Sequence, residues 1–583
     1  MPTLEWIGKS KVINHHQEVP FRVLERKYSF DENGQHNEDN GSENMIIRGD
    51  NLEALKALLP RYEGHVKCIY IDPPYNTGNE GWVYNDNVND PKIKKWLGAV
   101  VGKEGEDLTR HDKWLCMMYP RLKLLQKLLA DDGVIFISID DTEYANLKLI
   151  CDEIFGSNCF VSNISWQRTY STRNDSKGIV NEVEHLVVYS KLPDWNPNKL
   201  PRTAEMDAKY KNPDNDRTLW RTDNAFAPGA ATHQGMVYAI QHPFTGKMLY
   251  PSNGACWRYQ QDQMLEIMRG WCGYELRDLN DAHERAVVCG VPESDVRQGV
   301  QAIVLSESLE ISAQKAQAVY DRGQWPRFFF TKGGKGGIAR KTYLENVGGK
   351  LPTNFWAFTE TGHTDEAKKE MLAIFDGKAT FDTPKPHRLI EFVLKVAGNE
   401  NALVLDSFAG SGTTAHAVLN MNKADGGHRK FILVEMMDYA DSITAERVKR
   451  VIQGYGEGKN AVEATGGNFS FYDLGEQLMI GDVLNENVDT NKIQEYVYFM
   501  ETREPLPKSG NGNPYYLGAC RGTAYYFYYE KAAITTLNHA FLATILEKAE
   551  GYVIYADICT VPPEELAKHN ITFKKIPRDI AKL

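Results

Sequence analysis

Short apolar runs alternate with amphipathic segments over two separate parts of the chain, residues 45–190 and 365–455. The runs have the length of buried strands in a parallel sheet, and the segments between them carry apolar residues at helical spacing. The runs lie at residues 45–48, 68–71, 134–139, 160–166, 184–189, 403–405 and 431–434. Strands that alternate with helices predict an α/β fold with a parallel, doubly wound sheet.

One predicted helix starts directly after the run at 45–48, with Leu52, Leu55 and Leu59 on one face. Asp50 followed three residues later by Glu53 resembles a capping box. The helix N-cap and a ligand-binding residue are therefore both open roles for Asp50, and one residue can fill both.

The periodicity weakens between about 195 and 350, where Pro, Gly and Trp are frequent, so this segment is predicted to be a separate or inserted domain. The tail mixes strand-like and helical segments without a catalytic pattern, which predicts a small α+β domain. The expected parts are residues 1–44 (an N-terminal arm and linker), 45–194, 195–350, 351–455 and 456–583.

The end of the weakly periodic segment, Arg322 to Lys350, holds seven basic residues and one acidic residue, Glu345. Aromatic residues, among them Trp325 and Phe328–Phe330, lie between the basic ones. Basic side chains mixed with aromatic rings suit a phosphate backbone and unstacked bases. The alternative is a solvated loop over an ordinary core strand.

The net charge of −11 argues against a protein that coats nucleic acid indiscriminately, although it does not exclude a local basic groove. The nine cysteines include no Cys-x-x-Cys pair, so neither a zinc ribbon nor a disulfide framework is predicted. No stretch has the length and hydrophobicity of a membrane span, and the N-terminus does not resemble a signal peptide. We therefore expect a cytoplasmic protein.

Asp72-Pro73-Pro74-Tyr75 follows the apolar run 68–71. The two prolines cannot continue the strand as ladder donors, so the backbone leaves the sheet at its carboxyl end, where open α/β sheets bind ligands. The Asp72 carboxylate and the Pro73 carbonyl can each accept a hydrogen bond from an amine, and the Tyr75 ring can stack on a planar base. An ordinary strand-ending turn is the alternative.

A second candidate, Asp406-Ser407-Phe408-Ala409-Gly410-Ser411-Gly412-Thr413-Thr414, lies between the run 403–405 and a helix. Glycines in a strand–turn–helix context let a ligand approach the backbone. Glu435 ends the next strand, and an acidic residue there commonly binds ribose hydroxyls; a helix cap or a surface acid is the alternative. No lysine follows Gly412, so this is not a phosphate-binding P-loop.

With both motifs present, the sequence resembles the amino-methylating DNA methyltransferases that use S-adenosylmethionine. The tetrapeptide precedes the glycine turn, with a large non-periodic segment between them, as in the circularly permuted β class. Gly49-Asp50-Asn51-Leu52-Glu53-Ala54-Leu55, Thr383-Pro384-Lys385-Pro386 and Ile576-Pro577-Arg578-Asp579-Ile580 are similar to the modification (Mod) subunits of type III restriction–modification systems. The resemblance implies a Rossmann-like, permuted methyltransferase sheet, with residues 195–350 as a target-recognition domain.

The resemblance also implies roles for single residues. Asp72 and the Pro73 carbonyl would bind the exocyclic amine of a flipped base and aim its nitrogen at the sulfonium methyl, and Tyr75 would stack on the base. The expected catalytic residues are Asp72, Pro73, Pro74 and Tyr75. The expected cofactor-binding residues are Asp50, Thr383, Lys385, Asp406, Phe408, Ala409, Gly410, Gly412, Thr413 and Glu435. The expected DNA contacts are Arg168, Arg327, Lys332, Lys335 and Arg340. No metal is needed, because the sulfonium already activates the methyl group.

Asp at the first position of the tetrapeptide favours adenine N6 over cytosine N4. The leading hypothesis is thus a site-specific adenine methyltransferase that acts on double-stranded DNA in a restriction or related defence system. The resemblance implies a homodimer and a helicase–nuclease (Res) partner. Other hypotheses are cytosine-N4, RNA or protein-amide methylation, and a DNA-recognition subunit of a nuclease complex whose methyl transfer is secondary.

Overall fold

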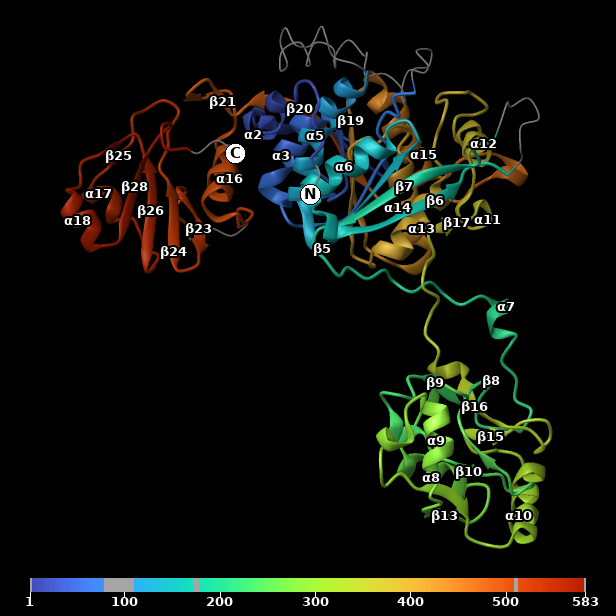
Figure 1. The fold of residues 1–583 in the computed structure, drawn as a ribbon. Helices are drawn as coiled ribbons and strands as arrows, with labels where there is room; N and C mark the ends of the chain where they lie inside the picture. The colour runs from blue at the N-terminus through green and yellow to red at the C-terminus, as the bar shows by residue number, and fades with distance from the viewer. Residues whose placement is uncertain (1–2, 78–109, 171–178, 508–511, 581–583) are drawn as a thin grey trace. The chain divides into compact units, whose positions relative to one another are not determined.

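The computed structural model describes residues 3–77, 110–170, 179–507 and 512–580 of the chain (Figure 1). The chain divides into two compact units. The first joins Met1–Asn198 with Pro352–Leu583, and the second is Lys199–Leu351. The second unit is therefore an insertion in the sequence of the first.

The first unit is built on a sheet that has eleven strands within the described residues. Their order is β17 (Phe355–Trp356), β6 (Phe160–Gln167), β7 (Val183–Ser190), β5 (Leu129–Ile139), β4 (Val66–Ile71), β18 (Leu403–Asp406), β19 (Lys430–Glu435), β3 (Met45–Arg48), β20 (Phe469–Gln477), β1 (Arg22–Asp31) and β2 (Gly34–His36). Strands from both sequence halves alternate in this order, so the two periodic parts of the chain form one sheet.

The six neighbouring strands from β5 to β20 run parallel. The predicted α/β fold is confirmed. The sheet is parallel at its centre but not throughout, because β7 is antiparallel to β5 and β6, and β1 is antiparallel to β20. β7 is the next strand after β6, and consecutive strands that pair directly are antiparallel, since a parallel pair needs a crossover connection.

Helices cover both faces of this sheet. From β4 the crossover through α5 (Arg110–Leu128) leads to β5, whereas from β18 the crossover through α14 (Thr413–Asp425) leads in the opposite direction, to β19. Because such crossovers are right-handed, the two helices lie on opposite faces. α5 packs with α3 (Asn51–Tyr62) and α6 (Tyr144–Phe155) over one core, and α14 packs with α13 (His387–Ala397) and α15 (Glu446–Gln453). The sheet is therefore doubly wound, as predicted.

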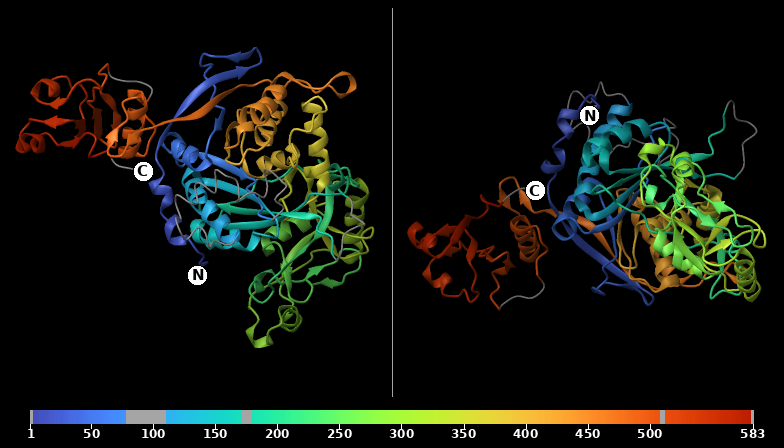
Figure 2. Two further views of the ribbon diagram at one scale, coloured as in Figure 1. Left: turned by 90° about the horizontal axis from the view of Figure 1, so that it is seen from above. Right: turned by 60° about the horizontal axis from the view of Figure 1, so that its bottom comes forward.

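Strands from the two ends of the chain widen the sheet. β1, from the predicted N-terminal arm, pairs with β20, from the predicted C-terminal domain, and the two run beside each other in Figure 2. β20 in turn pairs in parallel with β3. Both segments thus contribute to the large sheet, while their assignment to separate domains stays a prediction.

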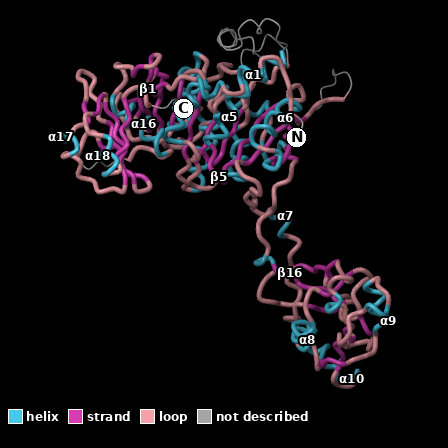
Figure 3. The backbone as a smooth tube through the Cα atoms, turned by 60° about the vertical axis from the view of Figure 1, so that its left-hand side comes forward, coloured by secondary structure: helices cyan, strands magenta, loops and turns pink. Residues whose placement is uncertain are grey.

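The rest of the C-terminal segment has mixed helix and strand content. A four-stranded sheet has the order β23 (Tyr516–Cys520), β24 (Thr523–Phe527), β26 (Gly551–Ala556) and β28 (Ile571–Lys575). The short helices α17 (His539–Leu542) and α18 (Pro563–Lys568) lie beside it, as Figure 3 shows. α16 (Thr490–Thr502) contacts α3, where Glu495 accepts a hydrogen bond of 2.6 Å from Arg61.

The second unit contains a sheet of β15 (Phe328–Phe330), β16 (Ile338–Tyr343) and β8 (Trp220–Asn224). A four-stranded sheet has the order β11 (Met248–Leu249), β10 (Ile240–Gln241), β14 (Ala302–Leu305) and β13 (Tyr274–Arg277). The same unit also contains three longer helices: α8 (Gln261–Arg269), α9 (Ala282–Cys289) and α10 (Leu309–Arg322). Within the described ranges of both units, no helix is long and apolar enough to cross a membrane.

Candidate active site

The two sequence motifs meet at the centre of the large sheet. β4 and β18 are neighbours in parallel register, with Cys68 opposite Val404 and Ile69 opposite Leu405. Asp72 directly follows β4, and Asp406 ends β18. The crossovers from these two strands lead in opposite directions, so this is the switch point of the sheet, and the edge beyond the strand ends is where such sheets bind ligands.

Asp72 is buried and is bound by a lysine from the other sequence half. Lys385 Nζ lies 2.8 Å from both carboxylate oxygens of Asp72. It also lies 2.9 Å from the Tyr75 hydroxyl and 3.6 Å from the carboxylate of Glu184, in β7. The Tyr75 hydroxyl is 2.9 Å from Asp72 and 3.2 Å from Glu184. One ammonium group thus lies between two buried carboxylates and a phenol.

The proline turn that carries this group is held by side-chain hydrogen bonds. Trp114 donates from Nε1 to the Pro74 carbonyl at 2.7 Å, and its side chain is fully buried. Asn76 has a φ of 59° and donates to the backbone carbonyl of Arg110 at 3.2 Å and to the buried Glu143. These contacts set the direction in which the chain leaves β4 and hold Tyr75 close to Asp72.

Burial and charge act in opposite directions on the ionisable groups of this pocket. Burial raises the pKa of Asp72 above its ordinary value, although Lys385 opposes the shift. Burial alone would raise the pKa of Glu184, but the charges of Lys385 and Arg168 bring it below the ordinary value. Burial opposes the charged form of Lys385, yet Asp72 and Glu184 together hold its pKa above the ordinary value. The lysine is therefore a stable cation here.

The predicted glycine turn connects β18 to α14 and is held by two carboxylates. Asp406 accepts from the Phe408 N–H at 3.0 Å and from the Thr414 hydroxyl at 2.6 Å, and burial raises its pKa to about 7. Glu435, at the end of β19, accepts from the Gly410 N–H at 2.8 Å. Glu435 also accepts from the Met437 N–H at 2.9 Å. Its observed contacts thus include the turn and the backbone that follows β19, and its predicted role toward a ribose stays a prediction.

The glycines in this turn have a structural reason of their own. Gly410 and Gly412 have φ values of 50° and 80°, in the left-handed region that favours glycine. A Cβ at Gly412 would lie 2.9 Å from the Thr444 carbonyl oxygen. Ala409 is buried, and the Phe408 side chain is half-buried. The turn thus presents the Phe408 ring and backbone groups at the sheet edge.

The remaining predicted cofactor residues surround the same edge. Asp50 caps α3 through the Leu52 N–H at 2.8 Å, and Arg121 approaches its second oxygen at 3.4 Å. The capping role is observed, and a ligand role stays a prediction. Half-buried Thr383 opens the segment that carries Lys385, whose carbonyl accepts from the Thr413 hydroxyl at 3.2 Å. Lys385 therefore connects the glycine turn, through its backbone, with Asp72, through its side chain.

Comparison with known proteins agrees with this geometry. Residues 66–446 match the family model described as DNA methylase. The chain belongs to the DNA methylase family. It is 33% identical over 444 residues to the Mod subunit of the type III restriction–modification enzyme StyLTI from Salmonella typhimurium, a match that covers 71% of this chain and 58% of the relative. It is 30% identical over 399 residues to the type II methyltransferase M.KpnI from Klebsiella pneumoniae, covering 68% of this chain and 81% of the relative.

The chain spans 56 to 66% of the length of four relatives that it matches, three named as type III Mod subunits and one as a probable one. Among solved structures, the cytosine-N4-specific PvuII DNA methyltransferase matches at 13% identity and a TM-score of 0.31, covering 70% of this chain and 86% of that one. This structural likeness adds nothing to what the strand order of the sheet shows.

The residues predicted to contact DNA are found in both units of the chain. In the first unit, Arg168 donates to Glu184 at 2.7 Å, so it completes the charge balance of the Asp72 pocket. In the second unit, Lys332 and Lys335 are exposed on the turn between β15 and β16. Arg327, also exposed, donates to the Tyr259 hydroxyl at 2.6 Å. Their contact with DNA stays a prediction.

Two details of the basic segment differ from expectation. The Phe328–Phe330 rings, expected to be available to unstacked bases, are buried in the core of the second unit, with exposures of 0, 4 and 0%. Arg340 donates to Asp223 at 2.5 Å, so its charge is balanced within the unit. The expectation of base stacking on these three rings was wrong, because they form a core strand beneath a solvated turn.

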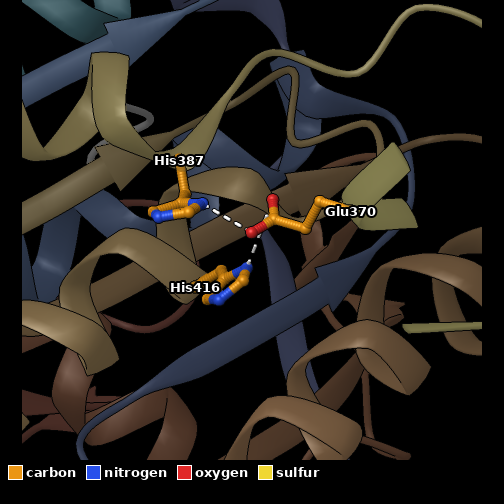
Figure 4. A group of neighbouring side chains, drawn as sticks. All are labelled: Glu370, His387 and His416. Carbon is orange, nitrogen blue, oxygen red and sulfur yellow. Dashed lines mark ion pairs between the residues drawn. The ribbon is translucent and has the colours of Figure 1, made fainter. Parts of the chain in front are cut away.

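A buried charged cluster lies behind the glycine turn. Glu370, His387 and His416 converge, as Figure 4 shows, with Glu370 at 2.6 Å from His387 and 3.9 Å from His416. A metal ion could use these ligand atoms. The guanidinium of Arg447, however, lies 3.0 Å from Glu370 and 3.1 Å from His416, where it already supplies positive charge. The residues present thus fit an ion-pair network better than a metal site.

Arg447 extends this network to the glycine turn. It donates to the Ser411 hydroxyl at 3.0 Å and to the Thr413 hydroxyl at 2.8 Å. The sequence analysis identified neither Arg447 nor Glu184 as a site residue. The sequence signal for Glu184 was a charged residue in an otherwise apolar strand, and for Arg447 a charged residue at an inward position of an amphipathic helix. Neither signal by itself identifies a function.

Proposed function

We propose that this DNA methylase transfers a methyl group from S-adenosylmethionine to N6 of an adenine turned out of double-stranded DNA at a specific site. The observation that carries the proposal is the meeting of Asp72 with the glycine turn at the switch point of the sheet. An acceptor for an amine and a turn suited to a nucleoside cofactor then share one edge.

The residues of the turn fit this cofactor. Ser407 Oγ is buried there without a hydrogen-bond partner among the described residues, and a polar ligand bound in the turn could provide one. Phe408 offers a ring face to a planar base. The cofactor would be held by Phe408, the Gly410–Gly412 backbone and Glu435, and would supply a methyl group activated by a sulfonium.

The protein's part in the reaction is binding and orientation. The Asp72 carboxylate and the Pro73 carbonyl would accept the two hydrogens of the adenine amine, which directs its nitrogen lone pair toward the methyl group. Tyr75 would stack on the base, and such stacking contributes about 1–3 kcal/mol, comparable with the cost of unstacking a base from the duplex. Asp72 supports adenine over cytosine only through the resemblance of the tetrapeptide.

We further propose that the chain acts as the modification subunit of a type III restriction–modification system. The similarity to proteins named as Mod subunits supports this role. A homodimer and a Res-type helicase–nuclease partner belong to the same proposal. Light scattering of the purified protein tests the dimer, and a fully active monomer at working concentration would contradict it.

The activity is tested by incubating the purified protein with radiolabelled S-adenosylmethionine and, separately, DNA from a methylation-deficient strain, RNA and protein. Label is expected in DNA alone. Single-molecule sequencing of that DNA should then show N6-methyladenine in one sequence context. Label in RNA or protein, or N4-methylcytosine in the DNA, would overturn the proposal.

A further inference from the structure

The Lys385 side chain occupies the acceptor that the proposed function assigns to the amine of the flipped base. Its ammonium group donates hydrogen bonds to both oxygens of Asp72. The same group is 2.9 Å from the Tyr75 hydroxyl and 5.0 Å from the ring centroid, so it lies at the hydroxyl edge of the ring. It therefore lies where a base amine bound to Asp72 would have to lie.

Competition for Asp72 follows from its burial and from the contacts that already occupy most of its acceptor sites. A carboxylate offers about four lone-pair sites. Lys385 engages both oxygens, and the Tyr75 hydroxyl is 2.9 Å from one of them. Because the carboxylate is also buried, a base amine can reach it in a productive orientation only if the ammonium group moves.

Glu184 offers the ammonium group a second position. Its carboxylate is buried, lies 3.6 Å from Lys385 Nζ and shares the Tyr75 hydroxyl with Asp72. Arg168 binds the other oxygen of Glu184 at 2.7 Å and so holds the carboxylate in place. A buried ammonium group left without a partner is costly, so a second carboxylate within a short movement is needed for Lys385 to leave Asp72.

The backbone of Lys385 is fixed while its side chain is long. The Lys385 carbonyl accepts from Thr413, and the flanking prolines, Pro384 and Pro386, are buried. A rotation of the side chain can therefore carry the ammonium group from one carboxylate to the other without disturbing the glycine turn.

We propose that Lys385 is a gate on the base pocket, whose ammonium group passes from Asp72 to Glu184 when the target base arrives. This inference rests on the proposed function, because it takes Asp72 as the acceptor of the base amine. In it, Lys385 and Glu184 are positioning residues: Lys385 keeps the acceptor paired between turnovers, and Glu184 receives the displaced charge.

The test is a double-mutant cycle with Glu184→Gln, Lys385→Met and the double variant, measured on DNA containing the methylated sequence found by sequencing. Single-turnover methylation with saturating S-adenosylmethionine is expected to be at least tenfold slower for Glu184→Gln. Removing Lys385 should remove the need for Glu184, so the double variant is expected to match Lys385→Met. Glu182→Gln, two residues away on the same segment, is the matched control and should behave as the wild type.

A second readout follows the base itself. The target adenine is replaced by 2-aminopurine, and fluorescence is recorded with S-adenosylhomocysteine present. Relative to the wild type, Lys385→Met is expected to raise the signal and Glu184→Gln to lower it. An unchanged or lower fluorescence signal for Lys385→Met would overturn the gate. If Glu184→Gln does not fold, the fluorescence of Lys385→Met is sufficient to test the gate.

The cycle separates this inference from the proposed function. The proposed function stands if the wild type methylates adenine and Asp72→Ala is inactive. In that case the gate is wrong if the losses of the two single variants multiply in the double variant. Wild-type activity in Glu184→Gln also overturns the gate. If Asp72→Ala retains activity, or the wild type does not methylate DNA, the proposed function itself is wrong.

Discussion

In each unit of the molecule a buried lysine lies between two carboxylates, and the two arrangements differ in what holds the lysine. In the first unit, Lys385 lies between Asp72 and Glu184 at the open end of two strands. In the second unit, Lys341 in β16 lies between Asp214 and Asp216, with both Lys341 and Asp214 side chains fully buried.

Lys341 has three hydrogen-bond partners in the second unit. Its ammonium group bonds to both carboxylates and to the Trp325 carbonyl at 2.7 Å. Asp214 also accepts from the Trp220 Nε1–H and from the Trp325 N–H, each at 2.8 Å. The ammonium group thus contacts both carboxylates and a backbone carbonyl at hydrogen-bond distance at the same time, and its partners belong to the core or its adjoining loop.

Lys385, by contrast, has a nearer and a farther carboxylate, and the nearer one follows directly after a central strand. The same residue types thus produce a rigid core pair in one unit and a candidate switch in the other. The comparison teaches that burial of a charge alone does not identify a functional site. A functional site is indicated when the buried charge also lies at a sheet edge that binds ligands and has more than one partner there.

The largest effect is expected for Asp72→Ala. Loss of the acceptor should slow methyl transfer on the order of 10²–10³-fold or more, as for other groups that position the reacting atom. Binding of S-adenosylhomocysteine, measured by calorimetry, should remain close to that of the wild type. Near-normal methylation by Asp72→Ala would mean that the Lys385 pair, like the Lys341 pair, has no part in the reaction.

Lys341→Met should instead act on stability. Removal of one partner from a buried ion pair leaves two carboxylates without their cation and is expected to cost about 3–5 kcal/mol of unfolding free energy. Urea unfolding followed by tryptophan fluorescence measures this cost. Lys335→Met, an exposed lysine of the same unit, is the control and should change stability by less than about 0.5 kcal/mol.

Asp406 is a third buried acid at the ligand-binding edge of the sheet. Unlike Asp72 and Glu184, its observed hydrogen-bond donors are uncharged: the Phe408 N–H and the Thr414 hydroxyl. Because its pKa is raised to about 7 from an ordinary 3.8, the folded chain keeps the proton longer than the unfolded chain. This group's contribution to stability is therefore present below pH 3.8 and is lost as the pH rises toward 7. Asp406→Asn should gain about 2–4 kcal/mol relative to the wild type over that window.

The measurement for Asp406→Asn is urea unfolding at several pH values between 4 and 8. A constant difference between variant and wild type across this range would contradict the shifted pKa.

The smallest effects are expected for the exposed basic residues of the second unit. Replacing Lys332 and Lys335 by alanine should weaken DNA binding and lower the slope of log K against log salt by roughly 0.9 for each phosphate that is no longer neutralised. Arg340→Ala should change the slope less, because Asp223 already balances its charge. Fluorescence anisotropy with duplex DNA at several salt concentrations distinguishes these cases, and equal slopes for all variants would argue against a DNA-binding turn.

Local pattern was sufficient for the central elements. The apolar runs became β3, β4, β18 and β19 because a run of that length can be buried only as a strand inside a covered sheet. Asp50 became the N-cap that its spacing to Glu53 indicated. These features depend on neighbours in sequence, which the chain itself specifies.

Contacts between distant segments could not be inferred from the sequence in the same way. Nothing in the chain order shows that Lys385 reaches Asp72, 313 positions away, or that Glu184 enters the same pocket on an antiparallel strand. The fate of Phe328–Phe330 also depended on packing, because a core strand and an exposed stacking surface have the same composition.

The sequence alone determined the kind of sheet, the two motifs at its strand ends and the family resemblance, because all three are carried by short-range spacing and residue type. The tertiary structure alone decided which charges contact one another. Those pairings follow from the strand order β5-β4-β18-β19, which brings the ends of β4 and β18 together although hundreds of residues separate them in sequence. Their pKa shifts follow in turn from burial at that shared edge.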